Sequence, residues 1–138
     1  MKVTVDANIL FAALLRDGIT RHLWFRRDLN LFAPGYELEE LRKYETELRG
    51  KFRGTDAEFT GLQNRVLAPV RFVSDSELAP FIPAAQALIS DDKDWLYLAC
   101  ALKEDTIIWS QDRHFREQKR IRVHTTAELM AQIGGLGK

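Results

Sequence analysis

Short apolar runs alternate with longer amphipathic stretches along this chain. Five runs rich in β-branched and aromatic residues predict strands, at residues 2–5, 29–33, 69–73, 106–109 and 121–123. Apolar residues that recur every three or four positions predict helices, at residues 9–15, 19–24, 36–48, 59–67, 77–89, 92–103, 113–118 and 126–133. Strands that alternate with helices indicate an α/β fold whose central, mainly parallel sheet has four to five strands.

Glycine and proline residues mark the boundaries between these elements. Pro34-Gly35 closes the second strand, and Gly50 and Gly54 are expected to end the long charged helix. A Gly-rich tail is expected to follow the last helix. The chain contains no repeat, low-complexity tract or interdomain linker, and 46% of its 138 residues are hydrophobic. We therefore expect a single domain over residues 1–138 with its own core.

Charge and cysteine content limit the binding partners and the cellular location that are expected for this chain. Twenty basic residues balance twenty acidic ones, so any nucleic-acid binding must come from local patches. The single cysteine, Cys100, lies in an apolar run and is expected to pack in the core of a cytoplasmic protein. No apolar run approaches the roughly 20 residues that a membrane span needs, so we expect a soluble protein with no membrane partner.

Acidic residues stand where the predicted strands end. Asp6 directly follows the first strand, Asp112 follows the strand at 106–109, and Asp94 lies in the first turn of the helix before that strand. Ligands of parallel α/β sheets bind at the carboxyl ends of the strands. Carboxylates gathered there would repel one another unless a cation lay between them, and oxygen ligands suit Mg²⁺ or Mn²⁺.

Helix capping is the simpler explanation for each residue taken singly. Asp and Asn are favoured N-caps, and carboxylates in a first turn complement the helix dipole. Capping alone could account for five residues near predicted helix starts: Asp6, Asn8, Asp91, Asp92 and Asp112. This explanation weakens when several of them meet at one rim of a sheet.

Four stretches, in order, resemble the motifs of PIN domains. Val3-Thr-Val-Asp-Ala-Asn-Ile-Leu10 resembles the family's opening, and Pro34-Gly-Tyr-Glu-Leu-Glu-Glu-Leu41 is similar to its Pro-x-Tyr-x-Leu-x-Glu-Leu. Ser90 to Ala101 resembles the family's Asp-x-x-Asp-x-x-x-Leu-Ala-x-Ala helix, and Ile108 to Asp112 resembles its strand end. His124-Thr-Thr-Ala-Glu-Leu129 matches the ending, so the resemblance spans the whole chain.

The resemblance implies a three-layer α/β/α fold and a metal-dependent ribonuclease that acts on RNA with Mg²⁺ or Mn²⁺. Many members are homodimers, and many are toxins restrained by a small antitoxin protein. By the resemblance the acidic site consists of Asp6, Glu40, Asp94 and Asp112. Asp6, Asp94 and Asp112 would hold metal and Glu40 would hold or deprotonate water. Asn8 and Ser110 would orient the ligands from a second layer of hydrogen bonds.

Two positions depart from the family pattern or leave it open. Many members carry an additional Asp where this chain has His114, which leaves the ligation of a second metal undecided. On the long helix, Glu37, Glu39 and Glu40 lie together. Glu40 is preferred because it precedes Leu41, as in the motif, although Glu37 lies close to the same helix face.

Two basic stretches are candidates for holding substrate. The first contains Arg42, Lys43, Arg49, Lys51 and Arg53 with Tyr44 and Phe52, and the second lies beside Asp112 and contains Arg113 and Arg116. A solvated charged face explains the first stretch about as well as substrate binding does, and the second stretch somewhat less well.

Two other functions fit parts of the pattern. A receiver-type domain is disfavoured because no Asp directly follows the strand at 69–73 and no Lys ends the later strand. The remaining alternative is a catalytically silent PIN fold that binds RNA or a protein.

Overall fold

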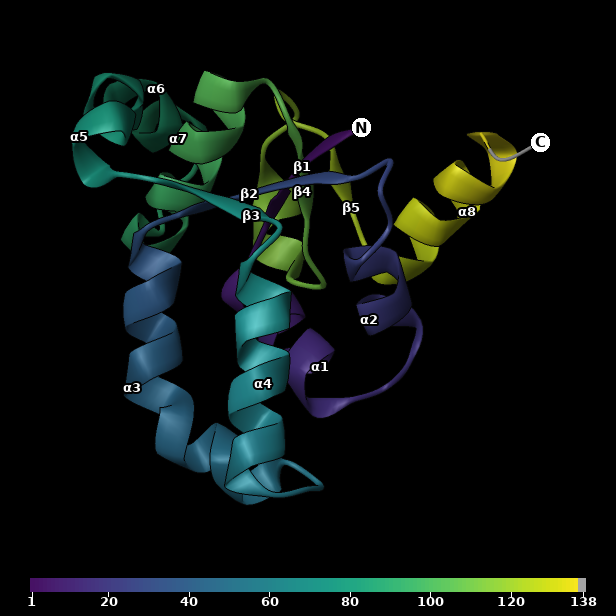
Figure 1. Cartoon of the computed structure of the whole chain (residues 1–138). Coiled ribbons are helices and arrows are strands. Elements are labelled where there is room, and N and C mark those ends of the chain that lie inside the picture. The colour runs from purple at the N-terminus through teal and green to yellow at the C-terminus, as the bar shows by residue number, and fades with distance from the viewer. Residues whose placement is uncertain (137–138) are drawn as a thin grey trace.

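The computed structural model describes residues 1–136, and it contains one five-stranded parallel sheet in the order β3-β2-β1-β4-β5 (Figure 1). The strands are β1 (Lys2–Val5), β2 (Asn30–Pro34), β3 (Val70–Val73), β4 (Ile107–Trp109) and β5 (Val123–His124). In the central strand, Val3 lies between Leu31 of β2 and Ile107 of β4. The predicted α/β class and the parallel sheet are confirmed.

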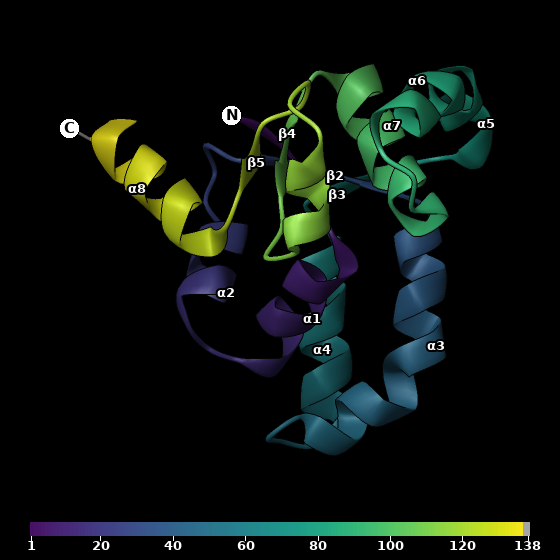
Figure 2. The same ribbon diagram turned by 180° about the vertical axis from the view of Figure 1, so that it is seen from behind.

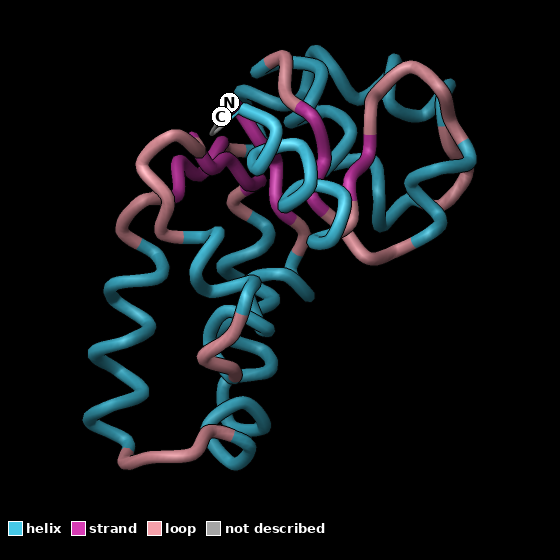
Figure 3. Tube along the Cα trace, turned by 90° about the vertical axis from the view of Figure 1, so that its right-hand side faces the viewer, coloured by secondary structure: helices cyan, strands magenta, loops and turns pink. Residues whose placement is uncertain are grey.

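Helices cover both faces of this sheet, which gives the three layers that were predicted (Figures 1 and 3). The α-helices are α1 (Ala7–Leu15), α2 (Ile19–Trp24), α3 (Tyr36–Lys51), α4 (Asp56–Leu67), α5 (Asp75–Leu78), α6 (Ile82–Leu88), α7 (Trp95–Glu104) and α8 (Thr126–Leu136). Three short 3-10 helices are η1 (Ala79–Phe81), η2 (Asp92–Asp94) and η3 (Arg113–Glu117). Within residues 1–136, no helix is long and apolar enough to cross a membrane.

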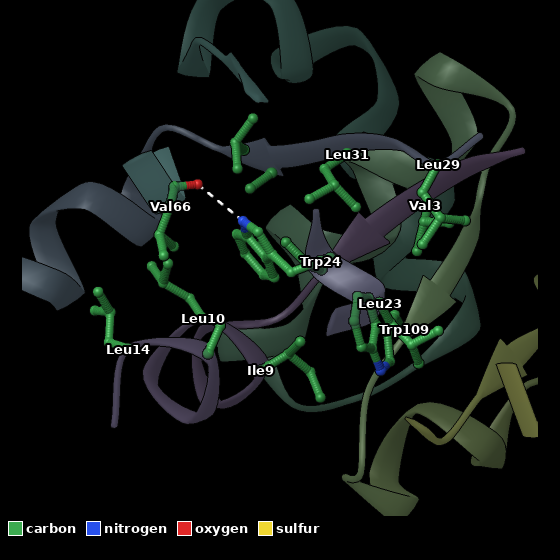
Figure 4. Close-up of a cluster of buried hydrophobic side chains, with 14 of the residues drawn as sticks. Val3, Ile9, Leu10, Leu14, Leu23, Trp24, Leu29, Leu31, Val66 and Trp109 are labelled. Atoms are coloured by element: carbon green, nitrogen blue, oxygen red, sulfur yellow. Dashed lines mark hydrogen bonds between the residues drawn. The ribbon is translucent and has the colours of Figure 1, made fainter. Parts of the chain in front are cut away.

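One core lies between the sheet and helices α1 to α4 and α8. Trp24 and Trp109 are its largest members, with 1% and 0% of their surface exposed and ring centroids 6.1 Å apart. Figure 4 shows Trp24 among aliphatic side chains, with its indole Nε1 donating to the carbonyl oxygen of Val66 at 2.9 Å. The one polar atom of the ring is therefore satisfied, and its burial adds stability without an unpaired donor.

The second core lies on the opposite face, under α5, α6 and α7. Leu98, Ala99 and Cys100 of α7 are all fully buried there, which confirms that Cys100 packs in the core. Burial raises the pKa of the Cys100 thiol to about 12. The thiol therefore stays protonated and unreactive at neutral pH.

The predicted helix at 77–89 is wrong in outline, because the segment is divided into α5, η1 and α6. Pro80 and Pro83 lack the backbone N–H that a continuous helix needs at those positions. Ser74 begins α5 earlier than expected, since its hydroxyl accepts the N–H of Glu77 and the Glu77 carboxylate accepts the N–H of Ser74.

Glycine proved a poor marker of helix ends. α3 continues through Gly50 to Lys51, and α8 continues beyond residue 133 through Gly134, so both predicted ends are wrong. A glycine costs a helix only about 1 kcal/mol relative to alanine, which the buried Leu48 and Ile133 nearby can offset. The last two residues of the predicted Gly-rich tail, 137–138, lie outside the described residues.

The fifth strand is shorter than predicted and begins at Val123 instead of residue 121. The N–H of Ile121 donates to Oε1 of Gln118 at 2.7 Å, and the Gln118 amide donates to the carbonyl oxygens of Phe115 and Ile121. A buried glutamine therefore takes the place of a strand neighbour for this stretch of backbone.

The sheet order creates a switch point between β1 and β4. From β1 the chain first builds outward through β2 and β3, and later returns to add β4 and β5 on the other side. At such a switch point a crevice forms outside the carboxyl ends of the two neighbouring strands, here β1 and β4. Asp6 directly follows β1, and Ser110 directly follows β4. After β2, α3 runs away from the sheet and α4 runs back to it, and α1 packs against both helices (Figure 2).

Candidate metal centre

Asp6 joins the end of β1 to the start of α1. Only 6% of its surface is exposed. Its Oδ1 accepts the backbone N–H of Ile9 at 3.0 Å, and its Oδ2 accepts the hydroxyl of Ser110. Burial raises the pKa of the Asp6 carboxyl and the nearby charge of Asp112 raises it further, although both hydrogen bonds oppose the shift. Asp6 therefore caps α1 and also lies at the switch point of the sheet.

Ser110 connects the ends of β1 and β4. Its side chain is buried, and its Oγ donates to Asp6 while accepting the backbone N–H of Asp112 at 2.9 Å. The hydroxyl thus ties two carboxylate-bearing segments that are about 100 residues apart in the chain. The other residue expected to orient ligands, Asn8, is exposed on α1 at the edge of the same cleft.

Asp94 lies at the end of η2, immediately before α7. It is 8% exposed, and its Oδ2 has no hydrogen-bond partner in the part of the chain that the structure describes. Burial raises the pKa of the Asp94 carboxyl to about 6, and the charges of Asp91 and Asp112 contribute to this shift. A buried carboxylate oxygen without a donor is costly, and a proton or a cation would remove that cost.

The first turns of α3 bring two acids to this region. Glu40 reaches the cleft, where it accepts the hydroxyl of Tyr36. Glu37 is fully buried, and neither of its carboxylate oxygens has a partner among residues 1–136. Burial raises the pKa of Glu37 well above its ordinary value, and the charge of Asp6 raises it further. Glu37 is therefore a functional candidate in addition to Glu40, which the family motif favours.

A signal for Glu37 was present in the helical spacing. Glu37, Leu41 and Leu48 are separated by intervals of four and seven residues, which place them on one buried stripe of α3. An acid on an apolar stripe has to be neutralised, so this spacing indicates Glu37 as a candidate beside the preferred Glu40.

The four acids predicted from sequence line one cleft of about 530 Å³ between α1, α3 and η2: Asp6, Glu40, Asp94 and Asp112. Three lysines also line it, namely Lys43, Lys51 and Lys93. The cleft therefore combines clustered oxygen ligands with positive charge at its margin.

A narrower group of possible ligand atoms includes Asp94 of the cleft lining. Asp91, Asp94 and His114 each place one such atom within 4.8 Å of the other two. Of the three acids expected to bind metal, only Asp94 belongs to this group. Oδ2 of Asp6 faces Ser110, and Oδ1 of Asp112 accepts the backbone N–H of His114 at 2.9 Å.

The two arginines expected to hold substrate lie elsewhere. Arg116 pairs with Glu128 and also donates to the carbonyl oxygen of Val123, which holds it against α8 and β5. Arg113 is exposed on η3. Neither residue lines the cleft, which is bordered instead by lysines of α3 and η2.

A parallel α/β sheet with carboxylates gathered at its switch point belongs to the class of domains that bind ligands at the carboxyl ends of their strands. The chain is a member of the PIN domain family, whose sequence profile matches residues 4–132. Its fold is similar to a crystal structure of VapBC2 from Rickettsia felis bound to a DNA fragment from their promoter. The TM-score is 0.68 and the identity 11%, over 91% of this chain and 98% of that one. No curated protein matched the sequence.

Proposed function

We propose that this protein is a metal-dependent ribonuclease that hydrolyses RNA phosphodiester bonds in the acidic cleft. The observation that carries the proposal is the buried, unsatisfied carboxylate oxygens of Asp94 and Glu37 beside Asp6. An uncompensated buried carboxylate costs on the order of several kcal/mol, which is a large share of the free energy of unfolding of a typical domain. Membership of a family of nucleases supports the same conclusion.

The residues that would hold Mg²⁺ or Mn²⁺ are Asp6, Asp94 and Asp112. They fit such an ion because all their donors are carboxylate oxygens, and because Oδ2 of Asp94 has no competing donor among the described residues. A bound divalent ion supplies positive charge that favours ionisation of water and stabilises the anionic phosphate in the transition state. Ser110 orients Asp6 toward the cleft through its hydroxyl, and Asn8, two residues after Asp6, lines the same cleft.

Glu40 would hold or deprotonate the attacking water. The hydroxyl of Tyr36 donates to its carboxylate and fixes the side chain against the cleft wall, and this contact raises the pKa of Tyr36 to about 12. Replacing Glu40→Gln is expected to lower kcat by about 10²-fold, the usual contribution of a positioned base. Glu39→Gln, an exposed neighbour on the same helix, is the matched control. Full activity in Glu40→Gln would remove this role.

The margin of the cleft supports a single-stranded substrate. Phe11 and Tyr44 lie edge to face with ring centroids 5.9 Å apart, and both are partly exposed. The ammonium group of Lys43 lies 5.4 Å from the centre of the Tyr44 ring. Aromatic rings beside cations are the usual means of stacking bases and holding phosphates of a single strand.

A second, more basic cleft extends this surface. It has a volume of about 1200 Å³ and shares Leu15 and Lys51 with the acidic cleft. Arg16, Arg53 and Arg65 line it, and within residues 1–136 none of them forms an ion pair. Positive charge is thus concentrated locally although the net charge of the chain is zero.

Cleavage of labelled single-stranded RNA with Mn²⁺ or Mg²⁺ tests the proposed activity. Cutting that is abolished by EDTA and by the double variant Asp6→Asn, Asp94→Asn is the expected result. No cutting of several RNAs, together with no divalent-metal binding by calorimetry, would favour the catalytically silent PIN fold that binds RNA or a protein.

We further propose that the protein is a cytoplasmic toxin that forms a homodimer and pairs with a small antitoxin. The similar fold in the VapBC2 structure supports this assignment. Three large apolar side chains are exposed on or beside the adjacent helices α2 and α8, namely Ile19, Phe25 and Met130, and would suit a subunit interface. Growth arrest on expression, relieved by a small neighbouring gene, is the expected result. A monomeric mass in light scattering would contradict the homodimer.

A further inference from the structure

We propose that Asp91, Asp94 and His114 form a mixed oxygen and nitrogen cation site that gives this protein a preference for Mn²⁺ over Mg²⁺. The proposal rests on the proposed function in one respect, since Asp94 also belongs to the candidate metal centre. It concerns binding, however, and can be tested in the absence of RNA.

The geometry is close to that of a bound ion. One ligand atom from each of the three residues lies within 4.8 Å of the others. Two ligands on opposite sides of an ion at roughly 2.1 Å each are separated by about 4.2 Å. Ligands at right angles around such an ion are closer, at about 3 Å, so the three side chains have to draw together by rotation to enclose a cation.

Burial distinguishes this group from an ordinary solvated acidic cluster. Asp94 is more than nine-tenths buried, and its Oδ2 lacks a hydrogen-bond donor within the described part of the chain. Asp91 is held beside it because Oδ1 of Asp91 accepts the backbone N–H of Lys93 at 3.0 Å. The N–H of Asp94 also donates to the carbonyl oxygen of Asp91, so the turn of η2 fixes both carboxylates at one place.

His114 completes the group from another part of the chain. Its ring Nδ1 lies 3.1 Å from Oδ1 of Asp112, and its backbone N–H donates to the same oxygen. Carboxylates that contact a ligating imidazole commonly fix its tautomer and orientation. Asp112 thus positions the ring of His114 at the edge of η2, and the imidazole is the only nitrogen donor in the group.

The nitrogen donor determines which cation the site favours. Mg²⁺ binds oxygen ligands in a strict octahedral arrangement and retains much of its water, whereas imidazole suits transition-metal ions. An Asp in place of His114 would make all the ligand atoms of the group oxygens. The variant His114→Asp therefore changes the donor atom while preserving a metal-binding group.

Metal titration of the RNA-free protein tests the proposal, with Mn²⁺ and Mg²⁺ as the probes. Calorimetry is expected to show a ratio of Mn²⁺ to Mg²⁺ affinity that falls by about tenfold in His114→Asp, the lower end of the usual effect of ligand-shell changes. Asp91→Asn is expected to weaken binding of both ions. His22→Ala, which removes an exposed histidine on α2, is the matched control. Circular dichroism confirms that each variant is folded.

Pulsed electron paramagnetic resonance of the Mn²⁺ complex gives a direct readout, because a coordinated imidazole nitrogen modulates the electron spin echo. The modulation is expected in the wild-type protein and absent in His114→Asp. An unchanged affinity ratio together with unchanged modulation would overturn the proposal. RNA cleavage that persists beside that result would retain the ribonuclease, whereas nitrogen ligation without any cleavage would retain this site and remove the nuclease.

Discussion

The carboxylates that follow strands and those carried by helical segments are satisfied in different ways. Asp6 accepts hydrogen bonds from Ile9 and Ser110, and Asp112 accepts one from His114. Asp94 lines the cleft and Glu37 is fully buried, and both have carboxylate oxygens that lack donors within residues 1–136. The acids at strand ends therefore have hydrogen-bond donors within the chain, although burial still raises the pKa of Asp6. The acids of η2 and α3 need a proton or a cation, which makes them the better indicators of function.

The largest expected effect comes from removing a helical acid. Asp94→Asn is expected to lower RNA cleavage by about 10³-fold, equivalent to about 4 kcal/mol of transition-state stabilisation. The metal-free variant should unfold at a urea concentration at least as high as the wild type does, since a costly buried charge is gone. Asp92→Asn, at an exposed neighbouring position, is the control. A variant that loses stability and keeps activity would reverse the comparison.

Removal of the contact between the strand ends should lower both the stability of the fold and the rate of RNA cleavage. Ser110→Ala leaves Oδ2 of Asp6 and the N–H of Asp112 without their partner. We expect a loss of about 1–3 kcal/mol in the free energy of unfolding and a 10- to 100-fold decrease in cleavage. Ser76→Ala provides a control, because its hydroxyl is exposed and contacts only Ser74. Denaturant unfolding and single-turnover cleavage measure the two effects, and an unchanged unfolding midpoint would contradict the first.

Metal-free stability should depend on pH through the helical acids. The pKa values of Asp94 and Glu37 are raised by burial, so folding favours their protonated forms. The stabilisation is complete below pH 4 and is lost as the pH rises through about 6 for Asp94. With screening by solvent at the cleft, we expect a loss of about 1–2 kcal/mol. Urea unfolding in EDTA from pH 4 to pH 7 measures it. A double variant Glu37→Gln, Asp94→Asn that keeps the full pH dependence would refute the assignment.

The smallest effect concerns the basic cleft, away from both groups of acids. Arg53→Ala is expected to weaken binding of single-stranded RNA a few-fold and to reduce the salt slope by about 0.7, as for one lost phosphate contact. Fluorescence anisotropy with an Asp94→Asn background avoids cleavage during the measurement. Arg122→Ala, exposed outside both clefts, is the control. Equal salt slopes for the two variants would place the RNA elsewhere.

The acids that follow strands are the part of the site that the sequence predicts. Asp6 and Asp112 were expected at one rim because parallel strands end at the same edge, and both line the cleft. Among the acids of α3, motif position favoured Glu40, whereas helical spacing with Leu41 and Leu48 indicated the buried position that Glu37 occupies. The grouping of Asp91 with His114 was not anticipated, since nothing local to either residue relates η2 to η3.

The sequence by itself determined the order of strands and helices, the α/β class, and the placement of acids at strand ends. Those properties follow from apolar spacing and from residues that are neighbours in the chain. Tertiary structure alone decided which carboxylates are satisfied. The donor for Asp6 is a hydroxyl 104 residues away, and His114 meets Asp94 only because η3 follows a strand beside β1. Such contacts depend on how distant segments pack, which local patterns do not encode.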